Sequence, residues 1–305
     1  MFAKPRPVVG ICGGNADSAS VRAMMTQIAT TGAVPIFLGN HANRNAEADL
    51  NKIDGLIVMG NDADIDPATY GQQAGPHTVS EAATPEGQAR AAYETALMKG
   101  ALAARMPLMG VCAGMQRLNV ICGGDLYQHV PDLTGHTHNQ YDLKLAPFIP
   151  VQPIHLVKDS TLAHVGDSLL SLFVPSHKQY VYGENSMHHQ AVQHVGKGLR
   201  AAAHSEDLLA DGSRLVEAIE ADPAGPLGKQ YVVGVQWHPE FSASELGAKL
   251  AHRMLQESQH FAQAHGRTHA PAEAARENLL SNGPRSGNLA ETIRDARVAA
   301  PIQRG

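Results

Sequence analysis

Short apolar runs rich in β-branched residues alternate with helix-like stretches through the first half of this 305-residue chain. The stretches with helical character are Val21–Thr31, Thr84–Ala104 and Met115–Ile121. The apolar runs between them predict strands at Val8–Ile11, Val34–Leu38, Gly55–Val58 and Leu108–Val111. Strands that alternate with helices are typical of parallel crossover units. The pattern therefore predicts an α/β fold with a mostly parallel central sheet flanked by helices.

The second half of the chain predicts shorter strands that are partly antiparallel. They are expected at Val151–Val157, Leu172–Val174, Ala191–His194, Leu199–Ala203 and Leu215–Ile219. A fully buried strand at Val232–Trp237 and an amphipathic helix over Ser244–His265 follow. We therefore expect one domain over residues 1–265, with a smaller antiparallel strand region in its second half.

Residues 266–305 are polar and rich in Ala, Arg and Asn, with too little apolar surface to offset the entropy of ordering. They predict a flexible C-terminal tail, with a marginal helix at Leu289–Val298.

Charge and cysteine content limit the classes of partner. A formal net charge of −5 and a pI near 6.4 argue against nucleic acid or an anionic membrane as the main partner. The chain has no apolar run of membrane-spanning length and no apolar segment typical of a secretory signal. Its three cysteines cannot all pair, and their spacing matches no zinc motif. We expect a cytoplasmic protein, with Cys12 in the core and Cys122 on a buried helix face.

Cys112 stands between two glycines, in Gly110-Val-Cys112-Ala-Gly114, after a predicted strand and before a predicted helix. A strand that turns directly into a helix holds the middle residue in a strained conformation, and small residues on both sides leave room for the turn. The helix N-terminus that follows favours the thiolate form of such a cysteine. The alternative is a buried structural cysteine, but the pattern favours a nucleophile.

A thiol nucleophile needs a base, and the segment Trp237-His238-Pro-Glu240 supplies a candidate. His238 and Glu240 lie two residues apart, so an extended backbone directs both side chains to the same side. They follow a predicted strand at the sheet edge where the active sites of α/β proteins gather. We predict Cys112 as nucleophile, His238 as general base and then acid, and Glu240 as the group that orients the imidazole. The alternative is an exposed His and Glu on a surface loop.

Together these segments resemble the class I glutamine amidotransferase superfamily, through Gly-Val-Cys112-Ala-Gly-Met-Gln116 and Val-Gln-Trp-His238-Pro-Glu240. Asn185-Ser-Met-His-His-Gln190-Ala-Val is similar to a motif of the bacterial γ-glutamyl-γ-aminobutyrate hydrolases. The segment from Asp54 to Pro67, followed by Tyr70-Gly71, is similar to a loop of the same hydrolases. The four segments occur in the expected order, and the resemblance runs from about residue 7 to about residue 265. It implies a glutamine amidotransferase-like fold of the flavodoxin-like type.

The resemblance also implies an oxyanion hole. One donor is expected to be the backbone N–H of Ala113, and the other is expected to come from the loop at Gly60 and Asn61. This chain departs from the family pattern at both places: Gly60-Asn61-Asp62 stands where many relatives have consecutive glycines, and Ala113 stands where these hydrolases commonly have arginine. We expect the departures to affect the amine specificity more than the reaction class.

Four further residues are matched to family positions by the resemblance. Gln116 is expected to contact the glutamyl moiety, and His189 and Gln190 are expected to meet its α-amino and α-carboxyl groups. Arg90 matches a family arginine, and both a role in the site and a solvated charge on a helix face stay open for it.

A metal site is not expected. His136 and His138, with His129 nearby, have no accompanying cysteine or carboxylate set, so they are interpreted as solvated loop or pocket-rim histidines. The alternating Asp62, Asp64 and Asp66 lack the spacing of a calcium loop and are expected to cap turns.

The leading hypothesis is a cysteine hydrolase, free of metal and organic cofactor, that cleaves a γ-glutamyl amide through a γ-glutamyl thioester. By resemblance the leaving amine is γ-aminobutyrate or another product of polyamine breakdown. The expected partner is this small-molecule substrate, and the oligomeric state is left open, with a homodimer as one option. The first alternative is a glutaminase subunit that delivers ammonia to a separate synthase. The second is a non-catalytic protein that binds a γ-glutamyl metabolite or a protein partner.

Overall fold

The computed structural model describes residues 6–39, 44–166, 180–242 and 244–267. Five parallel strands form the first half of its central sheet, in the order β2-β1-β3-β4-β11. They are β1 (Val8–Cys12), β2 (Val34–Leu38), β3 (Gly55–Val58), β4 (Leu108–Val111) and β11 (Val232–Val235). Nearly every residue of these strands is buried, because helices cover both faces of a parallel sheet. The predicted α/β fold and its parallel strands are confirmed.

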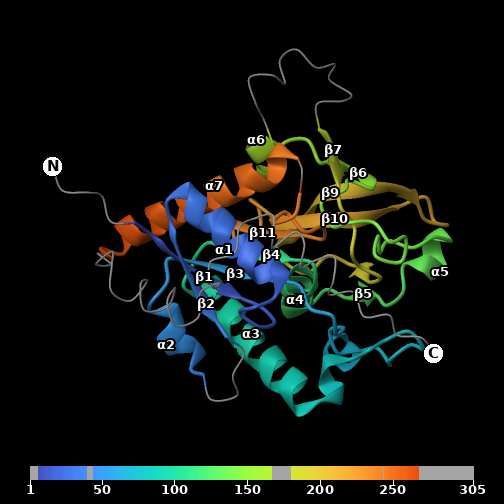
Figure 1. Cartoon of the computed structure of the whole chain (residues 1–305), viewed down its shortest axis with the longest axis horizontal. Helices are drawn as coiled ribbons and strands as arrows, with labels where there is room; N and C mark the ends of the chain where they lie inside the picture. The colour runs from blue at the N-terminus through green and yellow to red at the C-terminus, as the bar shows by residue number, and fades with distance from the viewer. Residues whose placement is uncertain (1–5, 40–43, 167–179, 243, 268–305) are drawn as a thin grey trace.

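Helices cover both faces of the sheet (Figure 1). On one face α1 (Ala19–Thr31) and α7 (Glu245–Ala264) pack together, and on the other lie α3 (Pro85–Ala103) and α4 (Ala113–Ile121). All four were predicted, with small differences at their ends. Each of α1, α3 and α7 begins directly after a capping residue, whose side chain accepts a hydrogen bond from an N–H group of the first turn. The capping residues are Ser18, Thr84 and Ser244, respectively.

The same sheet continues beyond β11 as an antiparallel region, which confirms the predicted change of character. Its strands are β10 (Arg214–Ala221), β9 (Leu199–Leu208), β6 (Gln152–Leu156) and β7 (Val181–Glu184), in this order. Two short strands, β5 (Leu126–Tyr127) and β8 (Ala191–Val192), pair with each other, and β8 also pairs with β10.

Several predicted boundaries were wrong. β8 ends at Val192 and β11 at Val235, two residues short of the prediction in each case, whereas β9 extends to Leu208 and β10 covers Arg214–Ala221. Cys12 is buried as predicted, but Cys122 follows the last residue of α4 and is only half-buried. The strand expected at Leu172–Val174 and the helix expected at Leu289–Val298 lie outside the described residues.

The shortest helices were not predicted from the sequence. They are α2 (Ala46–Leu50), α5 (Pro131–Thr134), α6 (Thr161–Gly166) and the 3₁₀ turns η1 (Pro67–Tyr70) and η2 (Glu81–Ala83). Segments of three to six residues are too short to show a helical period in the sequence. Among the residues described, no helix has both the length and the apolarity required to cross a membrane.

Candidate active site

Cys112 occupies a sharp turn between β4 and α4. Its backbone has φ 53° and ψ −114°, a sparsely populated conformation that costs on the order of 1–3 kcal/mol for a residue with a side chain. The two flanking glycines are required by close packing. A Cβ at Gly110 would lie 2.7 Å from the backbone of Gly114, and a Cβ at Gly114 would lie 2.1 Å from the carbonyl oxygen of Val58. The Gly-x-Cys-x-Gly spacing is therefore a steric requirement of this strand-to-helix turn.

His238 and Glu240 follow β11, which is the sheet neighbour of β4, so both strands direct their carboxyl ends toward Cys112. Nδ1 of His238 lies 2.7 Å from Oε1 of Glu240, whose side chain is fully buried. Burial disfavours the imidazolium, but the Glu240 carboxylate and the hydrogen-bonding contact with the Cys112 sulfur outweigh it and hold the pKa of His238 well above its usual value. The structure thus brings together the three residues predicted as nucleophile, base and orienting group.

Glu240 is itself held by the first turn of α1. The hydroxyl of Ser20, on that turn, donates a hydrogen bond to Oε1 of Glu240. α1 has no acidic residue of its own in its first turn, so Glu240 supplies the negative charge that a helix N-terminus favours. The contact fixes the Glu240 side chain in the position from which it orients the imidazole.

Asn185 fixes the backbone of His238 from the opposite side. Its amide group donates to the carbonyl oxygen of His238 and accepts from the His238 N–H, both at 2.8 Å. Two residues further along the same segment, the carbonyl oxygen of Met187 lies 3.9 Å from Sγ of Cys112. The segment that precedes β8 therefore contacts both members of the thiol–imidazole pair.

Gln236 is a second polar contact of the Cys112 thiol. Its side-chain N–H group donates to Sγ at 3.6 Å, and its Oε1 accepts from Nε2 of Gln116 at 3.1 Å. Nε2 of Gln116 also donates to the carbonyl oxygen of Gln190 at 3.1 Å. Gln116 was expected to contact the glutamyl group. In this structure its amide protons hold Gln236 in the orientation that directs a donor at the sulfur, and the contact with a glutamyl group stays a prediction.

The Gly60–Asn61 loop lies directly against the pair of reacting side chains. A Cβ at Gly60 would lie 3.1 Å from Cε1 of His238 and 3.3 Å from Cβ of Cys112. Ala113, the other expected oxyanion donor, is the first residue of α4, where N–H groups lack intrahelical acceptors. The predicted oxyanion residues are therefore both adjacent to Cys112, one in space and one along the chain.

Arg90 holds this loop, which settles the alternative left open by the sequence. It donates to the carbonyl oxygen of Gly60 at 3.1 Å and to Oδ1 of Asn61, and it forms an ion pair with Glu94 at 2.7 Å. With a side chain only 11% exposed, it is not a solvated helix-face charge.

The same ion-pair network continues into the protein. Arg117 binds the other oxygen of Glu94 at 3.0 Å and both oxygens of Glu81, at 3.1 and 2.5 Å. The four charged residues of this network lie on α3, α4 and η2. Through Arg90 they anchor the Gly60–Asn61 loop to α4, the helix that begins directly after Cys112.

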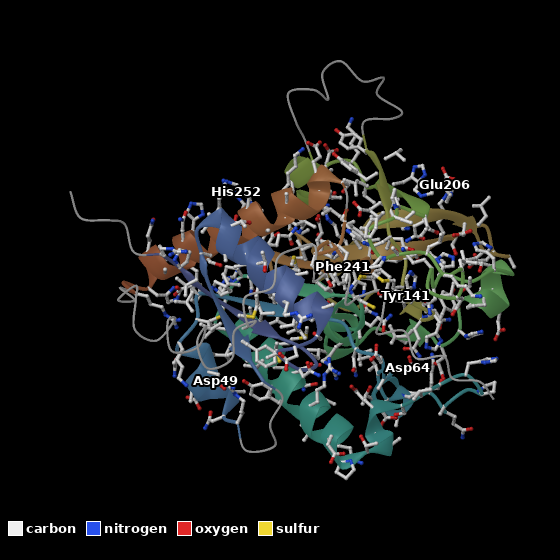
Figure 2. The ribbon with its side chains drawn as sticks, in the orientation of Figure 1. Asp49, Asp64, Tyr141, Glu206, Phe241 and His252 are labelled. Atoms are coloured by element: carbon white, nitrogen blue, oxygen red, sulfur yellow. The ribbon has the colours of Figure 1, made fainter. Side chains whose placement is uncertain are left out.

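His189 and Gln190 were expected to line the substrate pocket. Nε2 of His189 lies 2.8 Å from Asp64, which is labelled in Figure 2, and its side chain is 34% exposed. The Gln190 side-chain amide is buried, and neither its oxygen nor its nitrogen has a hydrogen-bond partner among the described residues. Of the acidic residues expected to cap turns, Asp66 does so by accepting from the Ala68 N–H at the start of η1, whereas Asp64 accepts from the Val79 N–H, 15 residues away.

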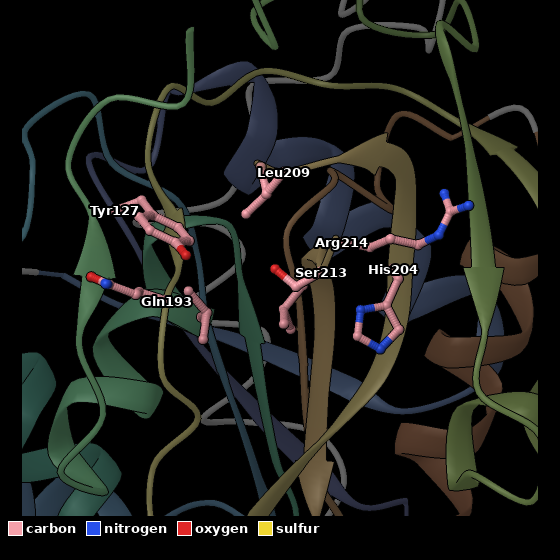
Figure 3. Close-up of a pocket in the computed structure, with 8 residues that line it drawn as sticks. Tyr127, Gln193, His204, Leu209, Ser213 and Arg214 are labelled. Atoms are coloured by element: carbon pink, nitrogen blue, oxygen red, sulfur yellow. The ribbon is translucent and has the colours of Figure 1, made fainter. Parts of the chain in front are cut away.

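A cavity of about 420 Å³ lies elsewhere, beside β8, β9 and β10 (Figure 3). Its lining includes none of the predicted site residues. The residues that form it are Tyr127, Val192, Gln193, His204, Leu209, Ser213, Arg214 and Val216.

Comparison with known proteins places this geometry in a family. The Peptidase C26 family model matches residues 7–240, which include every residue of the site described above. The chain belongs to the Peptidase C26 family.

Individual relatives agree with this assignment. A protein provisionally named glutamine amidotransferase, from Mycobacterium tuberculosis, is 36% identical over 198 residues, which are 65% of this chain and 54% of that protein. The chain thus spans about half the length of this relative. Gamma-glutamyl-gamma-aminobutyrate hydrolase PuuD from Escherichia coli is 28% identical over 250 residues, 78% of this chain and 87% of the enzyme.

A solved structure supports the fold. A Thermoplasma acidophilum protein, provisionally described as one of the subunits of a GMP synthase, has a TM-score of 0.55 at 12% identity, and the match covers 87% of this chain and all of that one. At this identity the similarity concerns the fold alone.

Three side chains of this Peptidase C26 site were not predicted from the sequence as parts of it: Ser20, Asn185 and Gln236. Ser20 lies 220 residues from its partner Glu240, and no local pattern connects them. Gln236 did carry a signal, since it is a polar residue in an otherwise apolar buried run and such a residue must find hydrogen-bond partners.

Proposed function

We propose that this Peptidase C26 member is a cysteine-dependent hydrolase that cleaves a γ-glutamyl amide, γ-glutamyl-γ-aminobutyrate or a related γ-glutamyl amine, and releases glutamate and the amine. The observation that carries the proposal is the strained Cys112 thiol in contact with an imidazole that Glu240 orients. The 28% identical PuuD, which is named for hydrolysis of γ-glutamyl-γ-aminobutyrate, supports this substrate class.

In the proposed reaction the thiolate of Cys112, paired with the protonated imidazole of His238, attacks the γ-carbonyl carbon of the substrate. Negative charge develops on the carbonyl oxygen, where the N–H of Ala113 and the loop at Gly60 and Asn61 stabilise it. As the C–N bond breaks, His238 gives its proton to the leaving amine. This leaves glutamate bound to Cys112 as a thioester.

Water completes the cycle. His238, neutral after giving its proton to the amine, accepts a proton from the attacking water. The C–S bond then breaks, glutamate leaves, and the thiolate of Cys112 is restored beside the protonated imidazole. The buried amide of Gln190 and the half-exposed His189 are the proposed contacts of the glutamyl α-groups. Gln116 acts in this proposal as a positioning residue, because its donors are occupied by protein.

The decisive experiment measures glutamate release from γ-glutamyl-γ-aminobutyrate, from other γ-glutamyl amines and from glutamine, with the purified chain alone. Mass spectrometry of the quenched reaction is expected to detect a γ-glutamyl adduct on Cys112. Cys112→Ala should abolish release and adduct, whereas Cys122→Ala, at a half-buried thiol away from the site, should change neither.

Three results would contradict the proposal in different ways. Preference for glutamine over all γ-glutamyl amines would favour a glutaminase subunit. Binding without any turnover would favour a non-catalytic protein, and undiminished turnover by Cys112→Ala would exclude the thioester mechanism.

A further inference from the structure

Three buried, chemically reactive side chains meet near the candidate active site, and the proposed reaction uses none of them. His138 lies in the loop after α5, His188 in the segment before β8, and Glu217 on β10. The side-chain ligand atoms of the three lie within 4.8 Å of one another, and the residues are 4%, 5% and 0% exposed. Backbone contacts fix the arrangement, because the N–H of His188 donates to the carbonyl oxygen of His138.

The polar atoms of this group lack partners. Both ring nitrogens of His138, Nε2 of His188 and Oε1 of Glu217 form no hydrogen bond with any described residue. Asp207 forms an ion pair with His138, with 3.2 Å between its oxygen and Nε2, and its other oxygen lies 3.2 Å from Nε2 of His136. Buried polar atoms are nearly always satisfied, so Nε2 of His188 and Oε1 of Glu217, which face each other without a partner, indicate a missing ligand.

The tautomer of His188 shows what kind of ligand is missing. Its Nδ1 lies 3.0 Å from the carbonyl oxygen of Gln190, which only accepts, so Nδ1 carries the hydrogen and Nε2 carries a lone pair. That lone pair faces Oε1 of Glu217 at 3.8 Å. The gap between the two atoms is too long for a hydrogen bond.

The spacing and the surrounding contacts suit a metal ion. Two ligand atoms at about 2.0–2.1 Å from a tetrahedral zinc ion are roughly 3.4 Å apart, close to the gap between Nε2 and Oε1. Ligating histidines commonly donate their other N–H to a backbone carbonyl, as His188 does to Gln190. The second oxygen of Glu217 accepts from Gln152 at 3.2 Å, which orients the carboxylate.

We infer that His138, His188 and Glu217 form a binding site for one divalent transition-metal ion, with Zn²⁺ the best match for two imidazoles and a carboxylate. A bound ion would fasten the segment before β8 to the central strand β10. The same segment contributes the Met187 carbonyl beside Cys112 and the Asn185 clamp on His238. The site is therefore structural, and it supports the candidate active site without taking part in the reaction.

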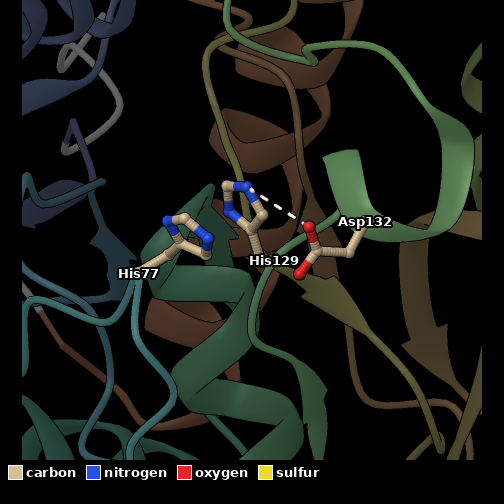
Figure 4. A group of neighbouring side chains, drawn as sticks. All are labelled: His77, His129 and Asp132. Atoms are coloured by element: carbon tan, nitrogen blue, oxygen red, sulfur yellow. Dashed lines mark ion pairs between the residues drawn. The ribbon is translucent and has the colours of Figure 1, made fainter.

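The interpretation of His138 as a loop or pocket-rim histidine in contact with solvent was wrong in one respect: the residue lies in a loop, but its side chain is buried. His188 and Glu217 are distant from it along the chain, so no local pattern indicated the three together. A second group, His77, His129 and Asp132, lies at the surface instead (Figure 4). There the rings of His77 and His129 stack at 4.0 Å, and Asp132 is 68% exposed. Solvent satisfies such groups, so this surface cluster serves as the control.

The test uses untagged full-length protein that has been treated with a chelator and dialysed. Titration with ZnCl₂ in a calorimeter is expected to give one tight site per chain, and Co²⁺ should give visible ligand-field absorption. Glu217→Gln preserves the shape of the side chain and removes its charge, and it should weaken binding by more than about 100-fold and abolish the absorption. His188→Asn should do the same, while His77→Ala should leave the site intact.

Two outcomes would overturn the inference. One is that wild type binds Zn²⁺ no more tightly than Glu217→Gln and His188→Asn, which would indicate that buried water occupies the gap. The other is that His77→Ala removes the tight site, which would place it at the surface cluster. Circular dichroism of each metal-free variant establishes that lost binding is not lost folding. Because the readout is metal binding, the result is independent of the proposed hydrolysis.

Discussion

The side-chain amide of Gln236 donates a hydrogen bond to the sulfur of Cys112 at 3.6 Å, and Gln116 prevents the amide from turning by donating to its oxygen. A hydrogen bond to the sulfur is stronger when the sulfur is charged, so this contact favours the thiolate over the thiol. Gln236 is fully buried, and its donor is therefore not exchanged for water. Gln236 is therefore a positioning residue, which directs a hydrogen-bond donor at the sulfur of Cys112.

We predict that Gln236→Glu, which keeps the shape but replaces the donor by an oxygen, lowers kcat/KM by about 10–100-fold. A hydrogen bond to a charged group contributes about 1.5–3 kcal/mol, which corresponds to about that range. The pH profile of iodoacetamide alkylation measures the reactivity of the Cys112 sulfur directly. Gln193→Glu, in the separate cavity of Figure 3, is the matched control. An unchanged alkylation profile in Gln236→Glu would refute the role.

We predict that iodoacetamide at neutral pH modifies Cys112 and neither of the other cysteines. Burial raises the pKa of Cys12, and it raises the pKa of Cys122 to about 11, so both remain thiols at neutral pH. Intact-mass spectrometry should detect one adduct in the wild type and none in Cys112→Ala. Labelling of Cys122 at a comparable rate would show that Cys112 has no special reactivity.

We predict that Gly60→Ala lowers kcat by about 100-fold or more while the free energy of unfolding changes by about 1 kcal/mol or less. The added methyl group would lie 3.1 Å from the imidazole of His238, so either the ring or the loop must move, and a displaced donor at an oxyanion site costs this much rate. Gly14→Ala is the control, because a methyl group there meets nothing within 4 Å. Equal kcat values for the two variants would argue against a role of this loop in the reaction.

The parallel half of the fold could be predicted because its strands are buried on both faces and therefore appear as uninterrupted apolar runs. The antiparallel half was harder to predict. β10, for example, carries buried Glu217 and Glu220 within its span, and these charges interrupt the apolar pattern by which a buried strand is recognised. Elements of a single turn, such as η2, depend on capping by Ser80 and give no periodic signal.

The candidate site was predictable where its residues are adjacent in the sequence. The glycines around Cys112 and the spacing of His238 and Glu240 are local constraints, and the sheet order that joins β4 to β11 brings the two segments together. Contacts between distant segments were not predictable. Ser20 donates to Glu240 across 220 residues of sequence, and the three residues proposed to bind metal meet only in the folded chain.

The raised pKa of His238 predicts a dependence of stability on pH. The pKa of His238 in the folded protein lies well above the usual 6.5. At a pH between 6.5 and the folded-state pKa, His238 is therefore protonated in the folded protein and neutral in the unfolded chain. The stabilisation is therefore complete below about pH 6.5 and is lost as the pH rises through the folded-state pKa, with a slope of at most about 1.4 kcal/mol per pH unit for one proton. Glu240→Gln removes the carboxylate that raises the pKa and should flatten this decline. Urea unfolding of both proteins between about pH 6 and pH 9 measures it, and two parallel curves would show that Glu240 does not control the protonation of His238.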